Sequence, residues 1–150
     1  MEYIKLIVVG KLKEDYLKNK AFEYERLIEK KNKIKVIELL DESIPKNAKE
    51  SINAIVKEKE GDKILEQIKN TDYVIALCID GKVTTSEKLR EIVNKGKSNT
   101  NGDIVFVIGG SLGLDDRVVK RANEKISFSK MTFPHQLMRI MLLEQMATYL

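Results

Sequence analysis

The sequence is poor in cysteine, tryptophan and proline, and these shortages exclude several classes of protein. A single cysteine among 150 residues cannot form an internal disulfide, so a reduced, cytoplasmic setting is expected. Two prolines and eight glycines exclude a collagen-like or low-complexity chain. No apolar run approaches the roughly 20 residues that span a bilayer, and the N-terminal run is too short for a signal peptide. The length and the 43% hydrophobic content predict one domain over residues 1–150.

Several common catalytic and binding motifs are also missing. No set of His, Cys, Asp and Glu has metal-ligand spacing, so no metal is expected. The glycines of residues 109–113 fit neither the G-x-G-x-x-G dinucleotide fingerprint nor a P-loop. Cys78 lies inside an apolar run, which favours a buried small side chain over a nucleophile. The order of the residues reveals no Ser-His-acid set.

Charge of one sign is only slightly in excess, but the excess is unevenly distributed. The chain carries 27 basic and 23 acidic residues, for a net charge of +4. Residues 11–35 hold nine Lys and Arg against five acids, a difference that equals the whole net charge. This segment is either a solvated helix face or an electrostatic footprint for a polyanion.

Apolar runs of strand length alternate with helical patterns along the chain. Residues 73–79 are almost wholly apolar, which is typical of a strand buried on both faces in a parallel sheet. The order predicts an α/β fold with a largely parallel sheet flanked by helices. We expect strands at 3–9, 34–40, 73–79, 104–108 and 126–128, with helical patterns at 16–28, 52–68, 84–93, 115–122 and 135–150. The first two helices have apolar faces of Tyr16, Leu17, Ala21, Tyr24, Leu27 and Ile28, and of Ile52, Ile55, Val56, Ile64, Leu65 and Ile68.

Local signals mark where several elements begin and end. Pro45 is expected in a loop, and Asp80-Gly81 is expected to end the third strand. Thr84 and Glu87 fit a capping box, which predicts Thr84 as the N-cap of a short helix. Residues 94–102 are expected to be polar and flexible.

Two further helical patterns contain informative residues. Gly61 lies inside the second one, where glycine costs helical stability and indicates the close approach of another segment. Asp115 and Asp116 suit the first turn of the fourth helix, because acids are favoured at its positive dipole end.

Ligands of parallel α/β sheets bind at the carboxyl ends of the strands, and three loops are expected there, after Ile79, Ile108 and Phe128. The glycine-rich residues 109–113 would let a ligand approach the backbone, and an ordinary glycine turn is the alternative. Residues 127–136 set two Phe and a Met beside small hydroxyl side chains. This composition suits a nucleoside-like ligand, and a hydrophobic plug under the sheet is the alternative.

His135 is the only histidine and begins the final helical pattern, with Arg139 one turn later on the same face. Together they could handle a proton and an anion, with His135 as general base or substrate contact. A helix-start residue bonded to the backbone is the alternative for His135.

The final helical pattern is apolar on more than one face. Residues 135–150 include ten apolar side chains, and a helix of this kind is buried on several sides. One side can face the sheet, and we expect the other to face a second subunit in a homodimer. A helix buried within a monomer is the alternative.

The glycine loop, the string of residues 128–136, Arg139 and Glu144-Gln145 closely resemble the RlmH family, the SPOUT-class 23S rRNA pseudouridine N3-methyltransferases. Val9–Lys13 and Lys57–Gly61 are similar to the family too, so the resemblance covers essentially the whole chain. It implies a SPOUT α/β knot with a C-terminal trefoil knot, S-adenosylmethionine as methyl donor, and a homodimer. It also implies methylation of a pseudouridine of 23S rRNA on the assembled 70S ribosome.

The resemblance implies which residues form the site. Methyl transfer would be an in-line displacement by a base nitrogen whose proton must first leave, and His135, Arg139 and Lys130 are the local candidates to assist. The cofactor contacts implied by the family are Leu77, Gly109, Phe128, Ser129, Lys130, Met131, Thr132 and Phe133.

The resemblance has one departure, at the end of the sequence. Family members continue the last helix into a polar Tyr-His tail near the cofactor and substrate, whereas this sequence stops at Leu150. We therefore expect cofactor binding to persist. The alternative function is a catalytically impaired, ribosome-associated RNA-binding module of the same fold.

Overall fold

The computed structural model describes residues 4–41 and 49–150. Tyr3, expected in the first strand, and Pro45, expected in a loop, lie outside the described residues. Strands and helices alternate along the chain, as the sequence predicted. Their bounds are β1 (Ile4–Val9), α1 (Asp15–Glu29), β2 (Ile34–Leu39), α2 (Glu50–Glu66), β3 (Tyr73–Val83), α3 (Ser86–Asn99), β4 (Ile104–Ile108), α4 (Asp116–Arg121), β5 (Glu124–Ser127) and α5 (His135–Tyr149).

The five strands form one parallel sheet in the order β2-β1-β4-β3-β5. Every residue of β1 and of β4 is buried, because these two strands lie in the middle of the sheet with helices on both faces. The edge strand β2 is only half-buried. The predicted α/β fold with a largely parallel sheet flanked by helices is confirmed.

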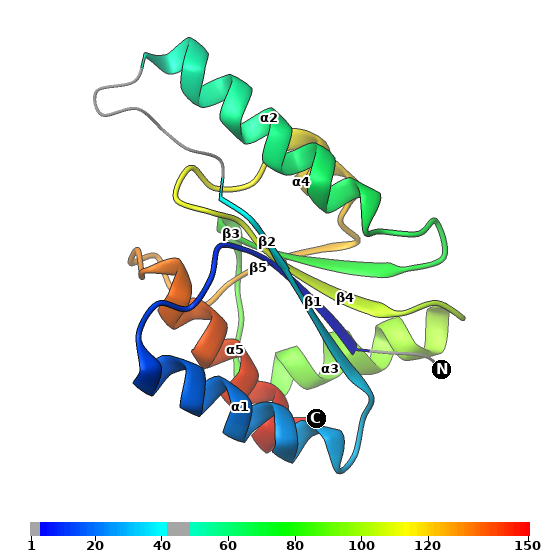
Figure 1. The fold of residues 1–150 in the computed structure, drawn as a ribbon. Helices are drawn as coiled ribbons and strands as arrows, with labels where there is room; N and C mark the ends of the chain where they lie inside the picture. Colours follow the sequence, from blue (N-terminus) through cyan, green and yellow to red (C-terminus); the bar gives the residue numbers. More distant parts are fainter. Residues whose placement is uncertain (1–3, 42–48) are drawn as a thin grey trace.

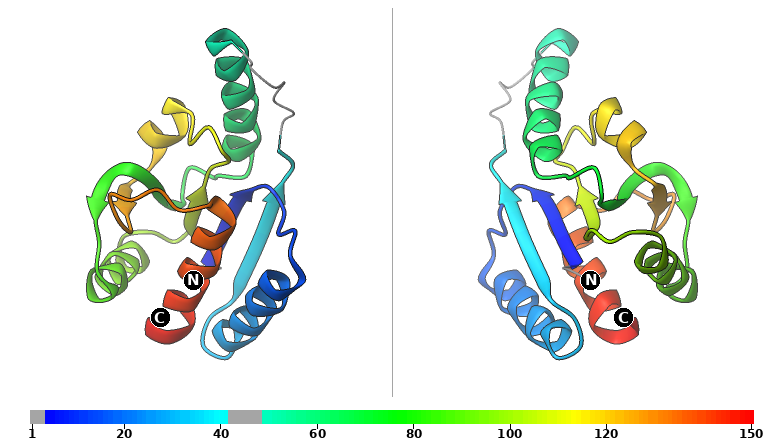
Figure 2. Two further views of the ribbon diagram at one scale, coloured as in Figure 1. Left: turned by 90° about the vertical axis from the view of Figure 1, so that its left-hand side faces the viewer. Right: turned by 90° about the vertical axis from the view of Figure 1, so that its right-hand side faces the viewer.

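Helices cover the sheet in two layers (Figures 1 and 2). α1, α3 and α5 pack on one face, against alternate strand positions such as the row Leu6, Phe106 and Ile75. α2 and α4 pack on the other face, against positions such as Ile7 and Val107. Among residues 4–41 and 49–150, no helix has both the length and the hydropathy that a membrane crossing requires.

β3 is longer than the sequence predicted. It does not end at Asp80-Gly81 but runs to Val83. Leu77 and Lys82 both pair with Ile126 of β5, so the residues between them form a bulge before β3 resumes its ladder. The Asp-Gly pair therefore marks this bulge and not the end of the strand.

The N-cap of α3 differs by one residue from the prediction. Thr85, and not Thr84, is the N-cap, and its hydroxyl accepts a hydrogen bond from the Lys88 backbone N–H at 3.1 Å. The Ser127 carbonyl accepts a bond from the Thr84 N–H at 2.9 Å, which keeps Thr84 at the end of the sheet.

α3 also extends further than predicted. Residues 94–102 were expected to be flexible, but the helix continues to Asn99. Its buried face runs through Leu89, Val93 and Gly96, and this packing holds a segment whose other side chains are polar.

The predicted apolar faces of the first two helices are only partly buried. Ala21 and Ile28 of α1 are buried, whereas Tyr16 is 68% exposed and Leu27 is 41% exposed. On α2, Ile55 is 53% exposed. The apolar residues of these helices extend around more of the circumference than the sheet covers, so their outer members face solvent.

Candidate active site

The carboxyl ends of β3, β4 and β5 bring the predicted cofactor loops together. Leu77 lies opposite Ile108 on one side and Ile126 on the other. Gly109 follows Ile108 directly, and Phe128 follows the end of β5. The structure therefore places Leu77, Gly109 and the start of the 128–133 loop at one edge of the sheet.

The glycine loop after β4 is a tight turn closed on itself. Gly113 has φ +83° and donates its N–H to the Gly110 carbonyl at 3.0 Å. A Cβ on Gly109 would lie 2.8 Å from the Gly113 backbone carbon, so the missing side chain makes room for the loop itself. The glycine-turn interpretation accounts for this part of the motif, and the loop still presents its backbone at the edge of the sheet.

The loop after β5 is held by its own serines. The Ser127 hydroxyl donates to the Ser129 carbonyl at 2.7 Å, and the Ser129 hydroxyl accepts from the Met131 N–H at 3.0 Å. Met131 is 70% exposed, and Lys130 and Thr132 are exposed too. These side chains are open to a ligand or to a second chain.

A cleft of about 260 Å³ opens between this loop, the start of α3 and α5. Its apolar wall includes Leu89, Phe128 and Met141, and the hydroxyl groups come from the start of α3. The combination of an apolar wall with a few polar groups is typical of a small-molecule site. The full lining is Thr84, Thr85, Ser86, Leu89, Phe128, Met141, Glu144 and Gln145.

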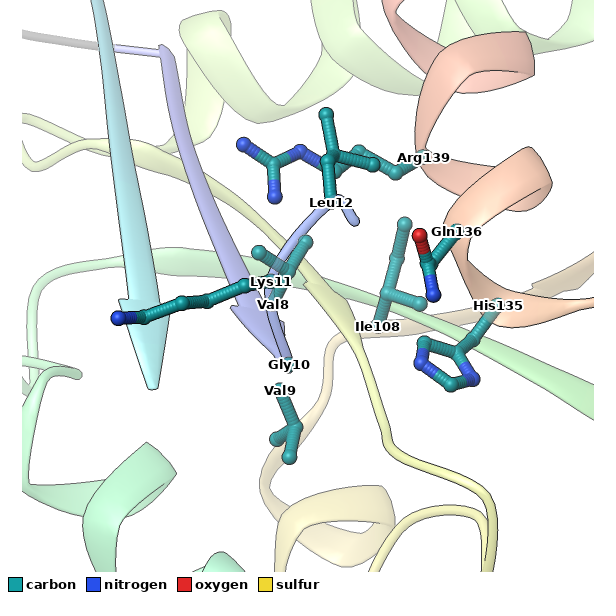
Figure 3. Close-up of a pocket in the computed structure, with 9 residues that line it drawn as sticks. All are labelled: Val8, Val9, Gly10, Lys11, Leu12, Ile108, His135, Gln136 and Arg139. Atoms are coloured by element: carbon teal, nitrogen blue, oxygen red, sulfur yellow. The ribbon is translucent and has the colours of Figure 1, made fainter. Parts of the chain in front are cut away.

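His135 lines a smaller pocket at the carboxyl ends of β1 and β4 (Figure 3). A Cβ on Gly10 would lie 3.0 Å from Asp41 Oδ2 and 3.3 Å from His135 Nε2, so both side chains converge on this glycine. Gly10 has φ +104°, a conformation that side chains disfavour. Lys11 points away from His135, across β2 (Figure 3).

Arg139 lies in the same pocket but is buried and paired. Its Nη1 is 2.5 Å from Glu38 Oε2 of β2, and its side chain is 8% exposed. Its Nε is buried and has no hydrogen-bond partner among the described residues. The half-buried Glu25 interacts electrostatically with the Arg139 guanidinium. Burial raises the pKa of Glu25, and the attraction of Arg139 only partly offsets that.

A second network fixes the end of the glycine loop against α2. A Cβ on Gly61 would lie 2.3 Å from Asp115 Oδ2, which explains the close approach that this glycine indicated. Asp115 is the N-cap of α4 and accepts from the Arg117 N–H. The Arg117 guanidinium bridges Asp115 at 2.6 Å and Asp62 at 2.9 Å. Burial favours a higher pKa for Asp115, but the hydrogen bonds from Arg117 outweigh it and lower the pKa.

Cys78 lines neither of the two pockets. Cys78 is half-buried in the β3 bulge, and burial raises the pKa of its thiol, which disfavours a thiolate nucleophile. In the described part of the chain, no group of three or more His, Cys, Asp and Glu could hold a metal ion.

Sequence reasoning did not find Asp41 or Glu38. Glu38 alternates with apolar residues in an edge strand, a pattern that gives it a solvent-facing position. Its partner Arg139 lies 101 residues later, so only the fold brings the two charges together. Asp41 lies two residues after the end of β2, at the same carboxyl edge as Gly10. A polar residue at the carboxyl end of a strand was the one sequence signal for it.

Comparison with known proteins identifies the family. Residues 2–147 match the family described as "Predicted SPOUT methyltransferase".

The chain belongs to the SPOUT methyltransferase family.

Two named relatives are similar to almost the whole chain. A protein of Bacillus pumilus named "Ribosomal RNA large subunit methyltransferase H" is 51% identical over 142 residues, which cover 95% of this chain and 89% of that protein. The protein of the same name from Clostridium novyi is 53% identical over 146 residues, with the same coverage. The resemblance to the RlmH family is thereby confirmed.

The SPOUT assignment also agrees with a solved fold. The crystal structure of tRNA (m1G37) methyltransferase from Aquifex aeolicus matches with a TM-score of 0.57 at 14% identity, over 99% of this chain and 70% of that one. At this identity the match concerns the fold alone. The C-terminal trefoil knot implied by the resemblance stays a prediction.

Proposed function

We propose that this chain is an S-adenosylmethionine-dependent methyltransferase that methylates N3 of a pseudouridine in 23S rRNA, on the assembled 70S ribosome. The observation that carries the proposal is the 51–53% identity to proteins named ribosomal RNA large subunit methyltransferase H, over 95% of the chain. The meeting of the 77, 109 and 128–133 segments at one edge of the sheet supports it.

Of the proposed cofactor residues, Phe128 lines a cleft whose composition fits S-adenosylmethionine. The cleft beside Phe128 combines an apolar wall for the adenine ring with hydroxyl groups for a ribose, and Glu144 is its one carboxylate. We propose that Leu77, Gly109 and residues 128–133 hold the cofactor, with Phe128 as part of the adenine wall. When bound, the cofactor supplies a methyl group already activated on a sulfonium, so the residues need only align the acceptor nitrogen and accept its proton.

We propose that His135 handles the proton of the acceptor nitrogen. The imidazole lies at the open edge of the sheet beside Gly10 and Asp41, where its ring nitrogens are placed to accept a proton from a base in the pocket. Arg139 is 7% exposed and its guanidinium is held by Glu38. We propose that Arg139 assists from within the fold, by fixing the first turns of α5 and with them His135.

We further propose a homodimer in the cytoplasm. α5 contacts α1 through Tyr24 and Glu144 at 3.0 Å, and α3 through Ser86 and Gln145 at 2.6 Å. α5 still leaves Leu137 40% exposed, one turn before Met141 of the cleft. A second chain on this side of α5 would cover that apolar surface next to the proposed cofactor residues.

Methylation of ribosomes tests the proposed function. Ribosomes that lack the modification are incubated with the chain and radiolabelled S-adenosylmethionine, and the site is mapped by primer extension. A methyl group on N3 blocks the pairing edge of the base, so reverse transcriptase should stop at one pseudouridine of 23S rRNA. His135→Ala should lose at least about 100-fold in rate, in line with the loss of a general base, and retain cofactor binding.

Two controls keep this experiment decisive. The exposed Glu91→Ala variant on α3 should methylate at the wild-type rate. In calorimetry, the wild-type chain and His135→Ala should bind S-adenosylmethionine alike. Cofactor binding without transfer to ribosomes under any condition would contradict the enzyme and favour the RNA-binding module of the same fold.

A further inference from the structure

We propose that the pocket beside His135 binds one carbonyl oxygen of the reacting base, and that Arg139 Nε is its hydrogen-bond donor. The proposal rests on the proposed function, and it names the group of the substrate that this part of the site holds. It gives a role to an N–H of the guanidinium that no described residue accepts. Arg139 would then contact the substrate as well as fix the start of α5.

The first observation is a buried donor without an acceptor. The Arg139 side chain is 8% exposed, and its Nη1 is paired with Glu38 Oε2 at 2.5 Å. Its Nε is buried and has no hydrogen-bond partner within residues 4–41 and 49–150. Nearly all buried donors of folded proteins are paired, because an unpaired one loses its hydrogen bonds to water without replacement. An oxygen that comes from outside the chain would supply the missing acceptor.

The second observation is the size of the pocket that Arg139 lines. Its volume of about 10 Å³ is at the lower limit for a single water molecule. Val8, Leu12 and Ile108 contribute apolar walls, and all three are buried. A hydrogen bond in such surroundings is stronger than one in water. The pocket therefore has room for one oxygen atom, while the ring that carries this oxygen stays at the open side.

The charges around Arg139 favour a neutral oxygen over an anion. Glu38 is paired with the guanidinium, and Glu25 interacts with it electrostatically. Two carboxyl groups therefore already face a single positive charge, so a phosphate or a further carboxylate would gain little there. A carbonyl oxygen needs only the N–H. The pyrimidine base of a pseudouridine offers such an oxygen on each side of N3.

The position of His135 matches a base held in this way. His135 and Arg139 lie one turn apart on the same face of α5, and both line the pocket (Figure 3). N3 and the carbonyl carbon are neighbours in the ring, so the two side chains can contact adjacent groups of one base. When His135 takes the N3 proton, negative charge spreads onto the carbonyl oxygen, and the hydrogen bond from Arg139 strengthens. N3 then forms its bond to the methyl carbon, while the carbon–sulfur bond breaks and leaves its electron pair on sulfur.

Arg139→Lys tests this role, because lysine keeps a cation for Glu38 but has a methylene at the position of Nε. Methylation of ribosomes gives kcat and KM, and calorimetry gives the binding of S-adenosylmethionine. We expect kcat to fall on the order of 100-fold, as for the loss of one donor to a developing oxyanion, with KM and cofactor binding unchanged. The matched control Arg26→Lys changes an exposed arginine of α1 and should have the wild-type kcat. A wild-type kcat for Arg139→Lys overturns the proposal, and so does a loss of kcat accompanied by loss of cofactor binding, which would show a structural role.

A crystal structure of the unliganded protein, at a resolution that shows water molecules, tests the pocket without any activity. We expect one water molecule bound to Arg139 Nε, at the place that the carbonyl oxygen would take. A dry pocket, or an acceptor on Nε from the protein itself, overturns the proposal. Absence of methylation by the wild-type chain would overturn the proposed function, whereas methylation that survives in Arg139→Lys would overturn this proposal alone.

Discussion

At the scale of single residues, two kinds of position are informative: glycines that leave room for a neighbouring side chain, and a carboxylate that is partly buried. Gly10 leaves room for Asp41 and His135 to converge, and Gly61 leaves room for Asp115. Glu25 is the partly buried carboxylate. Burial disfavours its charged form, and the nearby acids Glu29 and Glu38 disfavour it further. Each of these positions gives a substitution whose effect has a defined sign.

Gly61→Ala should destabilise the fold, although alanine is the better helix former. An exposed glycine replaced by alanine in a helix gains about 1 kcal/mol, but here the new Cβ would lie 2.3 Å from Asp115 Oδ2. Overpacking of this kind costs about 1–3 kcal/mol, so we expect a net loss in urea unfolding. In an Asp115→Gly background, which removes the obstructing side chain, Gly61→Ala should become stabilising. A loss of equal size in both backgrounds would show that the Asp115 contact is not the cause.

Glu25→Gln should stabilise the fold at neutral pH. The pKa of Glu25 is raised in the folded state, chiefly by burial, so the folded chain binds its proton more tightly than the unfolded chain does. Its contribution is favourable below the unfolded pKa and is lost as the pH rises through the folded pKa. The variant should therefore melt higher than wild type at pH 7, and the difference should shrink as the pH falls and Glu25 becomes protonated. The exposed Glu91→Gln should show no such trend; a difference that grows toward acid pH would contradict the assignment.

At the scale of elements, the sequence predicts what depends on local pattern. β1, β4 and the first half of β3 were predictable because they are buried on both faces and are therefore largely apolar runs. The placing of the 77, 109 and 128 segments at one edge followed from the rule that parallel strands end on the same side.

Features that depend on tertiary packing were not predictable. The bulge of β3 arises from pairing with β5, and no local signal separates a bulge at Asp80-Gly81 from a strand end. The last turns of α3 are polar in sequence and are held by packing of its buried face. The link between β2 and α5 through Glu38 and Arg139 joins residues that are 101 positions apart.

That ion pair should respond unequally to removal of its two partners. The Arg139 side chain is 8% exposed and the Glu38 side chain is 36% exposed. Glu38→Ala leaves the buried guanidinium without its ion-pair partner, which we expect to cost on the order of 2 kcal/mol. This is below the range for fully buried pairs, because Glu38 is partly solvated and the Glu25 carboxylate remains nearby. Arg139→Met fills the same volume and lets Glu38 turn toward water, so it should cost less, about 1 kcal/mol or below. Urea unfolding of both variants measures this, and a larger loss for Arg139→Met would contradict the argument.

At the scale of the whole molecule, α5 links one helical layer to the site. It lies between α1 and α3 on one face of the sheet, and its start contributes His135 to the edge where the loops meet (Figure 2). Its buried residues Leu142, Leu143 and Met146 complete the core. Within the monomer, α5 is therefore buried on more than one side. Its surface toward the cleft is still partly exposed.

The proposed dimer is tested by changing this exposed surface and measuring the molecular mass in solution. Leu137 is 40% exposed and lies one turn before Met141, which lines the cleft. By light scattering at micromolar concentration, the wild-type chain should have twice the 17.2 kDa mass of one chain. Leu137→Glu should shift it to the monomer mass, because a second chain would bury the new charge without a partner. Ile55→Glu, at a 53% exposed position on α2, should leave the dimer intact, and a wild-type chain that stays monomeric would contradict the dimer.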